Sequence, residues 1–224
     1  MRKIFITLLV SVLALNSCIY TDPDILYIDG GADIAEYIED IDIDWDYGSV
    51  VIRYWENNYV SFYEEDYYSR PIDQPMCYYL KNGKLRIKYY RHSNSNRQYK
   101  KLYLSVPQGI VFKSLEIDSN DAAIDVDLDA EYLDFDSVNG SIIYSTIYRY
   151  TKDIDIDSVN GEVNIILPVD AGFRLDFDSV SGNLYSEFNL FREGDSSFSY
   201  GNRYTDIDVD TVNSDLYLSF YEMQ

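Results

Sequence analysis

Histidine and cysteine are scarce in this 224-residue chain, which has one histidine, His92, and two cysteines, Cys18 and Cys77. Histidine is a common general base, so its near absence argues against most acid–base and nucleophilic catalysis. The chain also lacks the GxSxG, HExxH, P-loop and GxGxxG motifs that mark common hydrolase, metalloprotease and nucleotide sites. Catalysis therefore has little support in the sequence.

Basic residues are few, because 18 Lys and Arg stand against 39 Asp and Glu, which gives a formal net charge of −21. An acidic surface repels phosphate backbones, so nucleic acid is excluded as a partner. It equally repels an anionic lipid surface, so attachment to a membrane must be covalent or inserted.

No hydrophobic run reaches the about 20 residues that span a bilayer. The N-terminal run from Ile4 to Leu15 follows a basic pair and is typical of a secretory signal. It leads into Leu15-Asn16-Ser17-Cys18, which resembles the bacterial lipobox, whose cysteine is lipidated. We expect residues 1–17 to be a lipoprotein signal peptide, Cys18 to carry the lipid, and residues 18–24 to be a tether. An ordinary signal peptide with an incidental cysteine is the alternative.

Cleavage before Cys18 would leave 16 basic and 39 acidic residues, a net charge of −23. If Cys18 carries lipid, Cys77 has no partner for an internal disulfide, and we expect it to be a buried apolar residue. The protein would then be exported and anchored in the cell envelope. The outer membrane is the expected location, with either the periplasmic or the outer side exposed.

The composition favours β-structure, since 24 tyrosines and 10 phenylalanines suit strands. The strongest signal is a repeat in which apolar residues alternate with Asp and end in a Ser-Val-Asn-Gly-like turn. Its four clear copies are Leu133–Gly140, Ile154–Gly161, Leu175–Gly182 and Ile207–Ser214, with weaker copies at Leu115–Ala122 and Ile41–Gly48. Alternation with period two predicts strands with one buried face, and the Asn-Gly or Ser-Gly pairs predict bends that use positive φ.

A unit of about 20 residues predicts an all-β fold of the β-solenoid type, a single-stranded β-helix-like stack of short strands. A hairpin across each Asn-Gly is the alternative, which the regular recurrence disfavours. Inward residues would stack in columns, and an Asn ladder would lie beside the bends. The expected members are Val138, Val159, Val180 and Val212 for one inward column, and Asn139, Asn160 and Asn213 for the ladder. Residues Arg192–Asn202 are expected to be a loop between coils.

One continuous domain is expected, since no long Ser-, Gly- or Pro-rich linker interrupts the chain. Within it, residues 25–104 form a Tyr-rich β region and residues 105–224 form the repetitive solenoid region.

The repeats resemble a bacterial adhesin-like family known as domain of unknown function 4097 (DUF4097). The resemblance is carried by Ser158-Val159-Asn160-Gly161, by Leu167-Pro168 with Gly172-Phe173, and by Ser179-Val180-Ser181-Gly182. It extends over about residues 105–220. It implies an all-β, solenoid-like fold at the cell envelope, no catalytic residues and no defined ligand.

The outward half of each repeat is acidic. With coils about 4.8 Å apart, like charges cost roughly 1 kcal/mol per pair in bulk water. Hydration with salt screening, neighbouring basic residues or weak Ca²⁺ binding could offset this cost. Solvation is the favoured interpretation, because the EF-hand pattern fails at Tyr47, where glycine is required. The candidate Ca²⁺ ligands are Asp134, Asp136, Asp155, Asp157, Asp176 and Asp178.

Two other segments have an unusual composition. Half of the 16 basic residues that follow the expected signal lie between Lys81 and Lys101; a solvated edge strand is favoured over a site for anionic glycan or lipid head groups. Residues 54–103 hold 11 tyrosines, and their exposed rings could bind glycan or protein, although strand propensity is the plainer interpretation. The candidate binding residues are Tyr67, Tyr68, Tyr78, Tyr79, Tyr89 and Tyr90.

These observations predict a non-enzymatic, lipid-anchored envelope protein of adhesin type, without a cofactor. It would display strand faces and loops to an envelope or extracellular partner. Two alternatives remain open. One is a carbohydrate-active β-helix enzyme that uses paired Asp residues, and the other is a Ca²⁺-stabilised structural module.

Overall fold

The computed structural model describes residues 26–90, 97–146 and 151–221. The regular secondary structure in these ranges consists of β-strands. The strands are β1 (Ile28–Asp29), β2 (Ala32–Ile34), β3 (Asp40–Trp55), β4 (Val60–Asp66), β5 (Cys77–Lys81), β6 (Lys84–Lys88), β7 (Lys100–Pro107), β8 (Phe112–Asp127), β9 (Ala130–Ser137), β10 (Ile142–Ser145), β11 (Asp153–Ser158), β12 (Val163–Pro168), β13 (Phe173–Ser179), β14 (Leu184–Ser186), β15 (Phe191–Arg192), β16 (Ser197–Tyr200), β17 (Thr205–Thr211) and β18 (Leu216–Tyr221). Within the same ranges no helix could cross a membrane.

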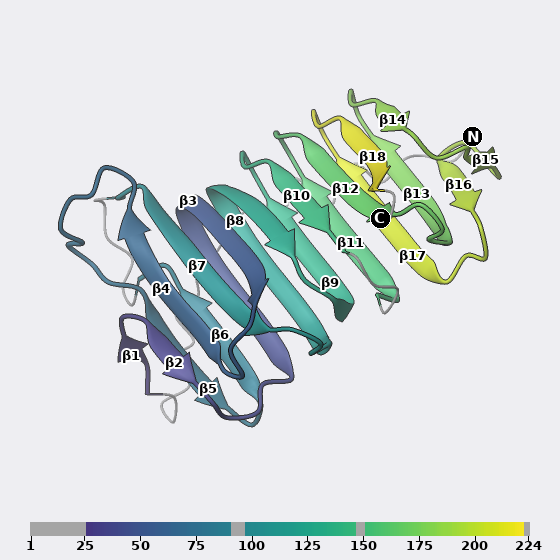
Figure 1. Ribbon diagram of the computed structural model, residues 1–224. Coiled ribbons are helices and arrows are strands. Elements are labelled where there is room, and N and C mark those ends of the chain that lie inside the picture. The colour runs from purple at the N-terminus through teal and green to yellow at the C-terminus, as the bar shows by residue number, and fades with distance from the viewer. Residues whose placement is uncertain (1–25, 91–96, 147–150, 222–224) are drawn as a thin grey trace.

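The strands form two facing layers, which β3 and β8 join by bending from one into the other (Figure 1). Layer A has the strand order β1-β5-β6-β3-β8-β9-β11-β17-β13-β16-β15. Layer B has the order β2-β4-β7-β3-β8-β10-β12-β18-β14. Each coil contributes one strand, or half of a long strand, to each layer.

The strands on either side of each Ser-Val-Asn-Gly bend pair with neighbouring coils and not with each other. For example, β9 pairs in parallel with β8 and β11, and β10 pairs in parallel with β8 and β12. The hairpin alternative is therefore wrong. The solenoid-like, all-β fold predicted from the repeat is confirmed.

The order of coils in space differs from their order in the sequence. The last coil, β17–β18, lies between β11–β12 and β13–β14, and β3 lies between β6–β7 and β8. The repeats alone could not reveal this arrangement, because every coil offers the same alternating edge to its neighbour. The segment expected to be a loop, Arg192–Asn202, contains β16, which pairs antiparallel with β13.

Antiparallel strands terminate most of the parallel stack. At one end β4 pairs with β7 and β5 pairs with β6, and at the other end β16 covers β13 in layer A. Terminal elements that differ from the repeat are typical of solenoids, since they cover edges that would otherwise pair with other chains.

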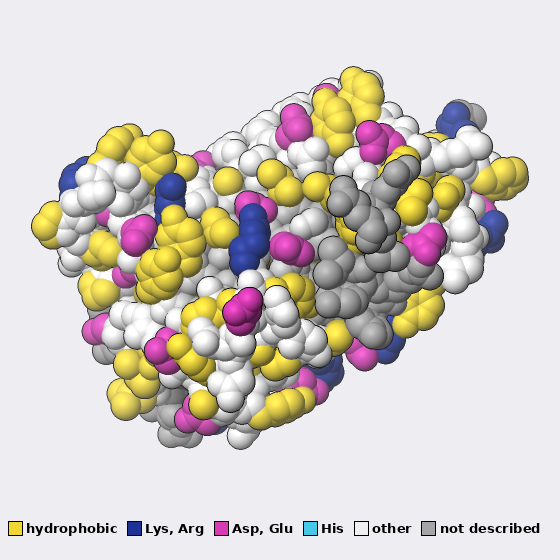
Figure 2. Space-filling view, viewed as in Figure 1, with side chains coloured by type: hydrophobic (Ala, Val, Ile, Leu, Met, Phe, Trp, Pro, Cys, Tyr) yellow, Lys and Arg dark blue, Asp and Glu magenta, His cyan; other side chains and the backbone are white. Residues whose placement is uncertain are grey.

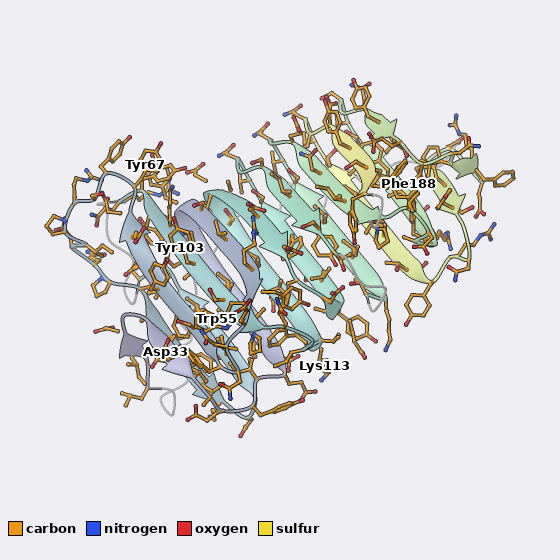
Figure 3. All side chains as sticks on the ribbon, viewed as in Figure 1. Asp33, Trp55, Tyr67, Tyr103, Lys113 and Phe188 are labelled. Carbon is orange, nitrogen blue, oxygen red and sulfur yellow. The ribbon has the colours of Figure 1, made fainter. Side chains whose placement is uncertain are left out.

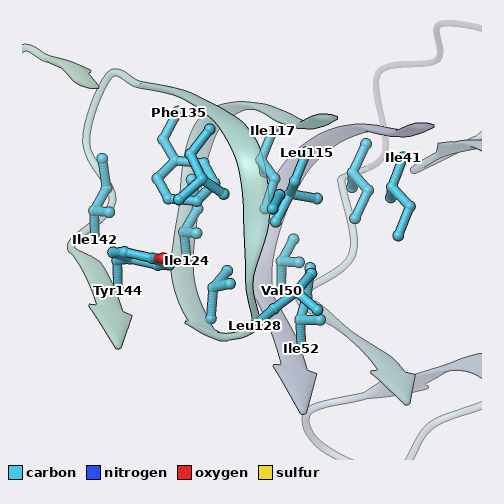
Figure 4. Close-up of a cluster of buried hydrophobic side chains, with 14 of the residues drawn as sticks. Ile41, Val50, Ile52, Leu115, Ile117, Ile124, Leu128, Phe135, Ile142 and Tyr144 are labelled. Atoms are coloured by element: carbon cyan, nitrogen blue, oxygen red, sulfur yellow. The ribbon is translucent and has the colours of Figure 1, made fainter. Parts of the chain in front are cut away.

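The inward residues of both layers form one hydrophobic core. Ile41, Leu115 and Ile117 of layer A face Val50 and Ile52 of layer B (Figure 4). These side chains are buried because successive residues of a strand point to opposite faces. Burial of each such side chain stabilises the fold by about 1.5–3 kcal/mol.

The bends differ from the prediction in two details. The expected valine column is not buried, since Val180 is 59% exposed and Val138, Val159 and Val212 are half-buried. The buried position belongs to the preceding hydroxyl residue, such as Ser137, whose Oγ accepts the Gly140 N–H at 3.0 Å.

Close packing, rather than positive φ, explains the glycine at the first of these bends. A Cβ at Gly140 would overlap the carbonyl of Ala122 in the neighbouring coil, and its φ is not positive. Gly161 has both features, with a φ of +141° and a carbonyl of the neighbouring coil in the position of a Cβ. The glycines therefore let adjacent bends approach each other closely.

Candidate functional site

The outer face of layer A carries two rows of carboxylates in register across six strands. The first row is Asp42, Glu116, Asp134, Asp155, Asp208 and Asp176, and the second is Asp44, Asp118, Asp136, Asp157, Asp210 and Asp178. The outward orientation expected for the repeat aspartates is confirmed, because their neighbours in the strands are the core residues. We call these two rows the carboxylate ladder.

Partial burial raises the pKa values of four carboxyl groups of the ladder. The pKa of Asp136 rises to about 7, and those of Asp118, Asp157 and Asp208 rise to about 6. The main cause is incomplete access of water, and neighbouring carboxylates add to it. The centre of the ladder therefore holds part of its protons near neutral pH, which reduces the repulsion.

Basic side chains neutralise the two ends of the ladder. At one end Lys84 lies 2.8 Å and Arg86 3.3 Å from Asp42, and at the other Arg174 lies 3.2 Å from Asp176. The basic segment is thus not a solvated edge, because its strand β6 lies between β5 and β3. The edge-strand interpretation was wrong. The charge pattern of one segment does not reveal which strands pair with it, so the sequence could not show that β6 is an interior strand.

The ladder extends across six strands and does not converge on one point. Among residues 26–90, 97–146 and 151–221, no group of three or more His, Cys, Asp or Glu side chains could hold a metal ion. Ca²⁺ binding by Asp134, Asp136, Asp155, Asp157, Asp176 and Asp178 stays a prediction. If it occurs, it would be spread along the rows rather than held in one coordination sphere.

A hydrogen-bonded ladder of amides runs along the bends, as predicted. Asn213 donates to Asn160 at 2.8 Å, and Asn160 donates to Asn139 at 3.0 Å. The ladder extends beyond the expected members, because Ser181 donates to Asn213 and Asn139 donates to Asp121. All four bonds point the same way, so each polarises the next.

The six candidate tyrosines do not form one site. Tyr67 and Tyr68 are exposed, whereas Tyr78, Tyr79 and Tyr90 are half-buried against other side chains. Tyr89 is 4% exposed, so it is not available to a ligand. Its ring lies beneath the ammonium of Lys100, 4.0 Å from the ring centroid, and serves the interior.

The outer face of layer B carries tyrosines that the sequence reasoning missed. Tyr63 stacks on Tyr103 at 5.0 Å between ring centroids, and Tyr185 stacks on Tyr217 at 4.8 Å. Figure 2 shows hydrophobic side chains gathered at the end that carries β4 and β7, and Figure 3 labels Tyr103 there. The Leu-Tyr pair that follows each of the last two repeats was a signal for the second stack.

A recess of about 310 Å³ opens where the chain crosses from β12 to β13. Its described lining is mainly apolar, with Leu167 and Phe173 among its residues, and Asp170 is the one carboxylate in that lining. Paired acid and base carboxylates, as a glycoside hydrolase requires, are therefore not found in this lining.

The cysteines and the histidine complete the set of candidates. Cys77 is fully buried on β5, as predicted. Cys18 and His92 lie outside the described residues.

The architecture places the chain in the class of proteins with a parallel, two-layered, β-solenoid-like fold. A family model described as Toastrack DUF4097 matches residues 108–219, which is half of the chain. The chain belongs to this family, as the resemblance of its repeats predicted. No match to the chain was found among curated proteins.

Two solved structures were found to be similar to the chain. A putative cell adhesion protein from Clostridium sporogenes ATCC 15579 has a TM-score of 0.64 and 12% identity, with 85% of this chain and all of that chain covered. A putative adhesin from Bacteroides fragilis NCTC 9343 has a TM-score of 0.35 and 9% identity, with 88% of this chain and 98% of that chain covered. The first of these likenesses shows a shared fold.

Proposed function

We propose that the protein is a non-enzymatic, lipid-anchored envelope protein that presents the outer faces of its solenoid to a binding partner. The single observation that carries this proposal is the even distribution of its carboxylates. They repeat in register across six strands and do not converge on one recess. The two carboxylates of a glycoside hydrolase instead face each other across one bound sugar.

The name of the similar solved structure from Clostridium sporogenes supports an adhesive role, since it is described as a putative cell adhesion protein. The N-terminal sequence supports the anchor, because Leu15-Asn16-Ser17-Cys18 matches the lipobox pattern. The described part of the chain begins beside β1, at the end of layer A. A lipid on Cys18 would therefore hold this end near the membrane, because eight residues reach at most about 28 Å.

The experiment combines fatty-acid labelling with protease treatment of intact cells that express the full chain. The wild-type chain should incorporate labelled fatty acid and sediment with membranes, whereas Cys18→Ser should do neither. Protease should remove the wild-type chain from intact cells if it faces outward. Cys77→Ser provides the matched control for loss of a thiol, and it should keep the label. A wild-type chain that carries no label would contradict the anchor.

Binding is tested separately with the full chain purified in detergent, immobilised and exposed to extracts of envelope proteins and glycans. Saturable binding that a boiled sample lacks is the expected result. Turnover of a polysaccharide into shorter products would contradict the non-enzymatic assignment.

A further inference from the structure

The outer face of layer B carries fewer carboxylates than the carboxylate ladder. Its central row, in register across eight strands, is Tyr63, Tyr103, Val51, Asp125, Ile143, Asn164, Tyr217 and Tyr185. Asp125 is the one carboxylate in this row, and Arg53 forms an ion pair with it. The central row is therefore almost without net charge, while the rows beside it carry Glu65, Asp127, Glu162 and Asp215 together with Lys101.

A tyrosine stack stands at each end of this row. The two rings of each stack are nearly parallel, with angles of 21° between Tyr63 and Tyr103 and 14° between Tyr185 and Tyr217. The outermost rings, Tyr63 and Tyr185, are 48% and 47% exposed. Tyr103 and Tyr217 lie five strands apart, which is about 24 Å at the usual spacing. The face thus has an aromatic platform at either end of its central row.

The strip between the platforms combines aliphatic groups with polar groups. Val51 and Ile143 lie in the central row beside the Asn164 amide, and the next row includes the hydroxyls of Ser145 and Ser219 and the carboxylate of Asp127. Aromatic rings pack against apolar C–H surfaces, and hydroxyls and amides exchange hydrogen bonds with other hydroxyls. A sugar ring offers apolar C–H groups on its faces and hydroxyl groups at its edges.

Charge selects among the possible occupants of this face. An anionic polymer is repelled by the net charge of −21, and so is a second copy of the chain. A cationic partner is attracted to the carboxylate ladder on the opposite layer instead. An uncharged, hydroxyl-rich polymer meets neither obstacle, so charge complementarity favours a neutral partner.

We propose that the outer face of layer B binds a neutral polysaccharide, whose chain lies across the strands between Tyr103 and Tyr217. This inference rests on the proposed function, because it assumes that the protein binds a partner. It names the face and the chemical class of that partner.

The test is affinity electrophoresis of the full chain in gels that contain dextran, mannan, xylan or mixed-linkage β-glucan, with polygalacturonate as an anionic comparison. At least one neutral polymer should retard the chain, and polygalacturonate should not. Tyr63→Ala and Tyr185→Ala should each raise the Kd obtained from the retardation roughly tenfold, as the loss of an aromatic anchor does. Tyr63→Phe and Tyr185→Phe should keep most of the binding, because the ring remains.

Tyr132→Ala is the matched control. Tyr132 is 47% exposed, like Tyr185, but lies on β9 in layer A, so its loss should leave binding unchanged. Circular dichroism checks that each variant is folded.

Three results would overturn the inference. The first is that no neutral polymer retards the chain, and the second is that Tyr132→Ala weakens binding as much as Tyr185→Ala does. The third is that the wild-type chain is a dimer and Tyr185→Ala is a monomer, which would assign the face to self-association. If the chain binds an envelope protein but no polysaccharide, this inference fails while the proposed function stands. If it binds neither, both fail.

Discussion

Lys100 offers the sharpest test of how the Tyr-rich region is held to the solenoid. Its side chain is 1% exposed, and Nζ lies 2.7 Å from Oε2 of Glu64, whose side chain is 6% exposed. Nζ also donates to the carbonyl of Gln74 at 3.0 Å and to that of Tyr89. One ammonium group therefore links β7 to β4 and to the segments that precede β5 and follow β6.

Replacement of Lys100 by Met keeps the length of the side chain and removes the charge. Glu64 Oε2 would lose the ammonium that lies 2.7 Å from it, while Oε1 would keep the N–H of Met76 at 2.6 Å. Loss of one partner of a buried pair costs about 3–5 kcal/mol, since the other charge stays desolvated. For a domain of this size, that cost lowers Tm by about 6–20 °C.

Urea and thermal unfolding of Lys100→Met, Glu64→Gln and the double variant measure this coupling. The double variant should recover most of the loss, because no buried charge then remains without a partner. Lys101→Met is the matched control, since Lys101 is half-buried on the outer face beside it, and its change should stay within about 0.5 kcal/mol. A Lys100→Met variant as stable as wild type, or strictly additive losses, would refute the reasoning.

Three further predictions concern the solenoid itself. Gly140→Ala should destabilise the fold by about 1–3 kcal/mol or more, because its Cβ would overlap Ala122. Gly109→Ala should cost only about 1 kcal/mol, because its Cβ meets open space and only its φ of +78° is unfavourable. Urea titration compares the two variants. Asn160→Ala removes two ladder hydrogen bonds and should cost about 1–2 kcal/mol by the same titration, and an unchanged midpoint would contradict the amide ladder. Because the pKa values of Asp136 and Asp118 rise from 3.8 to about 7 and 6, the folded state binds more protons than the unfolded chain between about pH 4 and 7. The Tm should therefore fall as the pH rises through this range, and Asp136→Asn should raise the Tm at pH 8 and weaken the pH dependence.

The sequence was enough to predict the parts of the fold that depend on local alternation. Apolar residues at every second position identified the inward faces, and the recurrence of the bend identified coils rather than hairpins. The amide ladder followed from the same register, because Asn139 and Asn160 occupy equivalent places in successive coils. These features depend on short-range patterns and on their repetition, which are visible in a single sequence.

The parts that were missed depend on which coil meets which. The insertion of β17–β18 between two earlier coils leaves no mark in the alternation, so the meeting of Tyr185 with Tyr217 was not foreseen. Likewise, the basic residues of β6 needed a known neighbour, the acidic half of β3, before their role as ladder counter-charges could be seen. Tyr89 was misplaced because a Tyr-Tyr pair fixes only that one ring points inward, not which one.

The intercalated coil is the arrangement on which both functional proposals depend, since it places Tyr217 beside Tyr185 and completes the carboxylate ladder. Oxidative cross-linking of paired cysteines tests it directly. Asp157→Cys with Asp210→Cys should form a disulfide readily, because these residues face each other on adjacent strands. Asp157→Cys with Asp178→Cys should not, because β17 separates them by about 10 Å. A cross-link in the second pair and none in the first would contradict this order of coils, and with it the binding face of layer B.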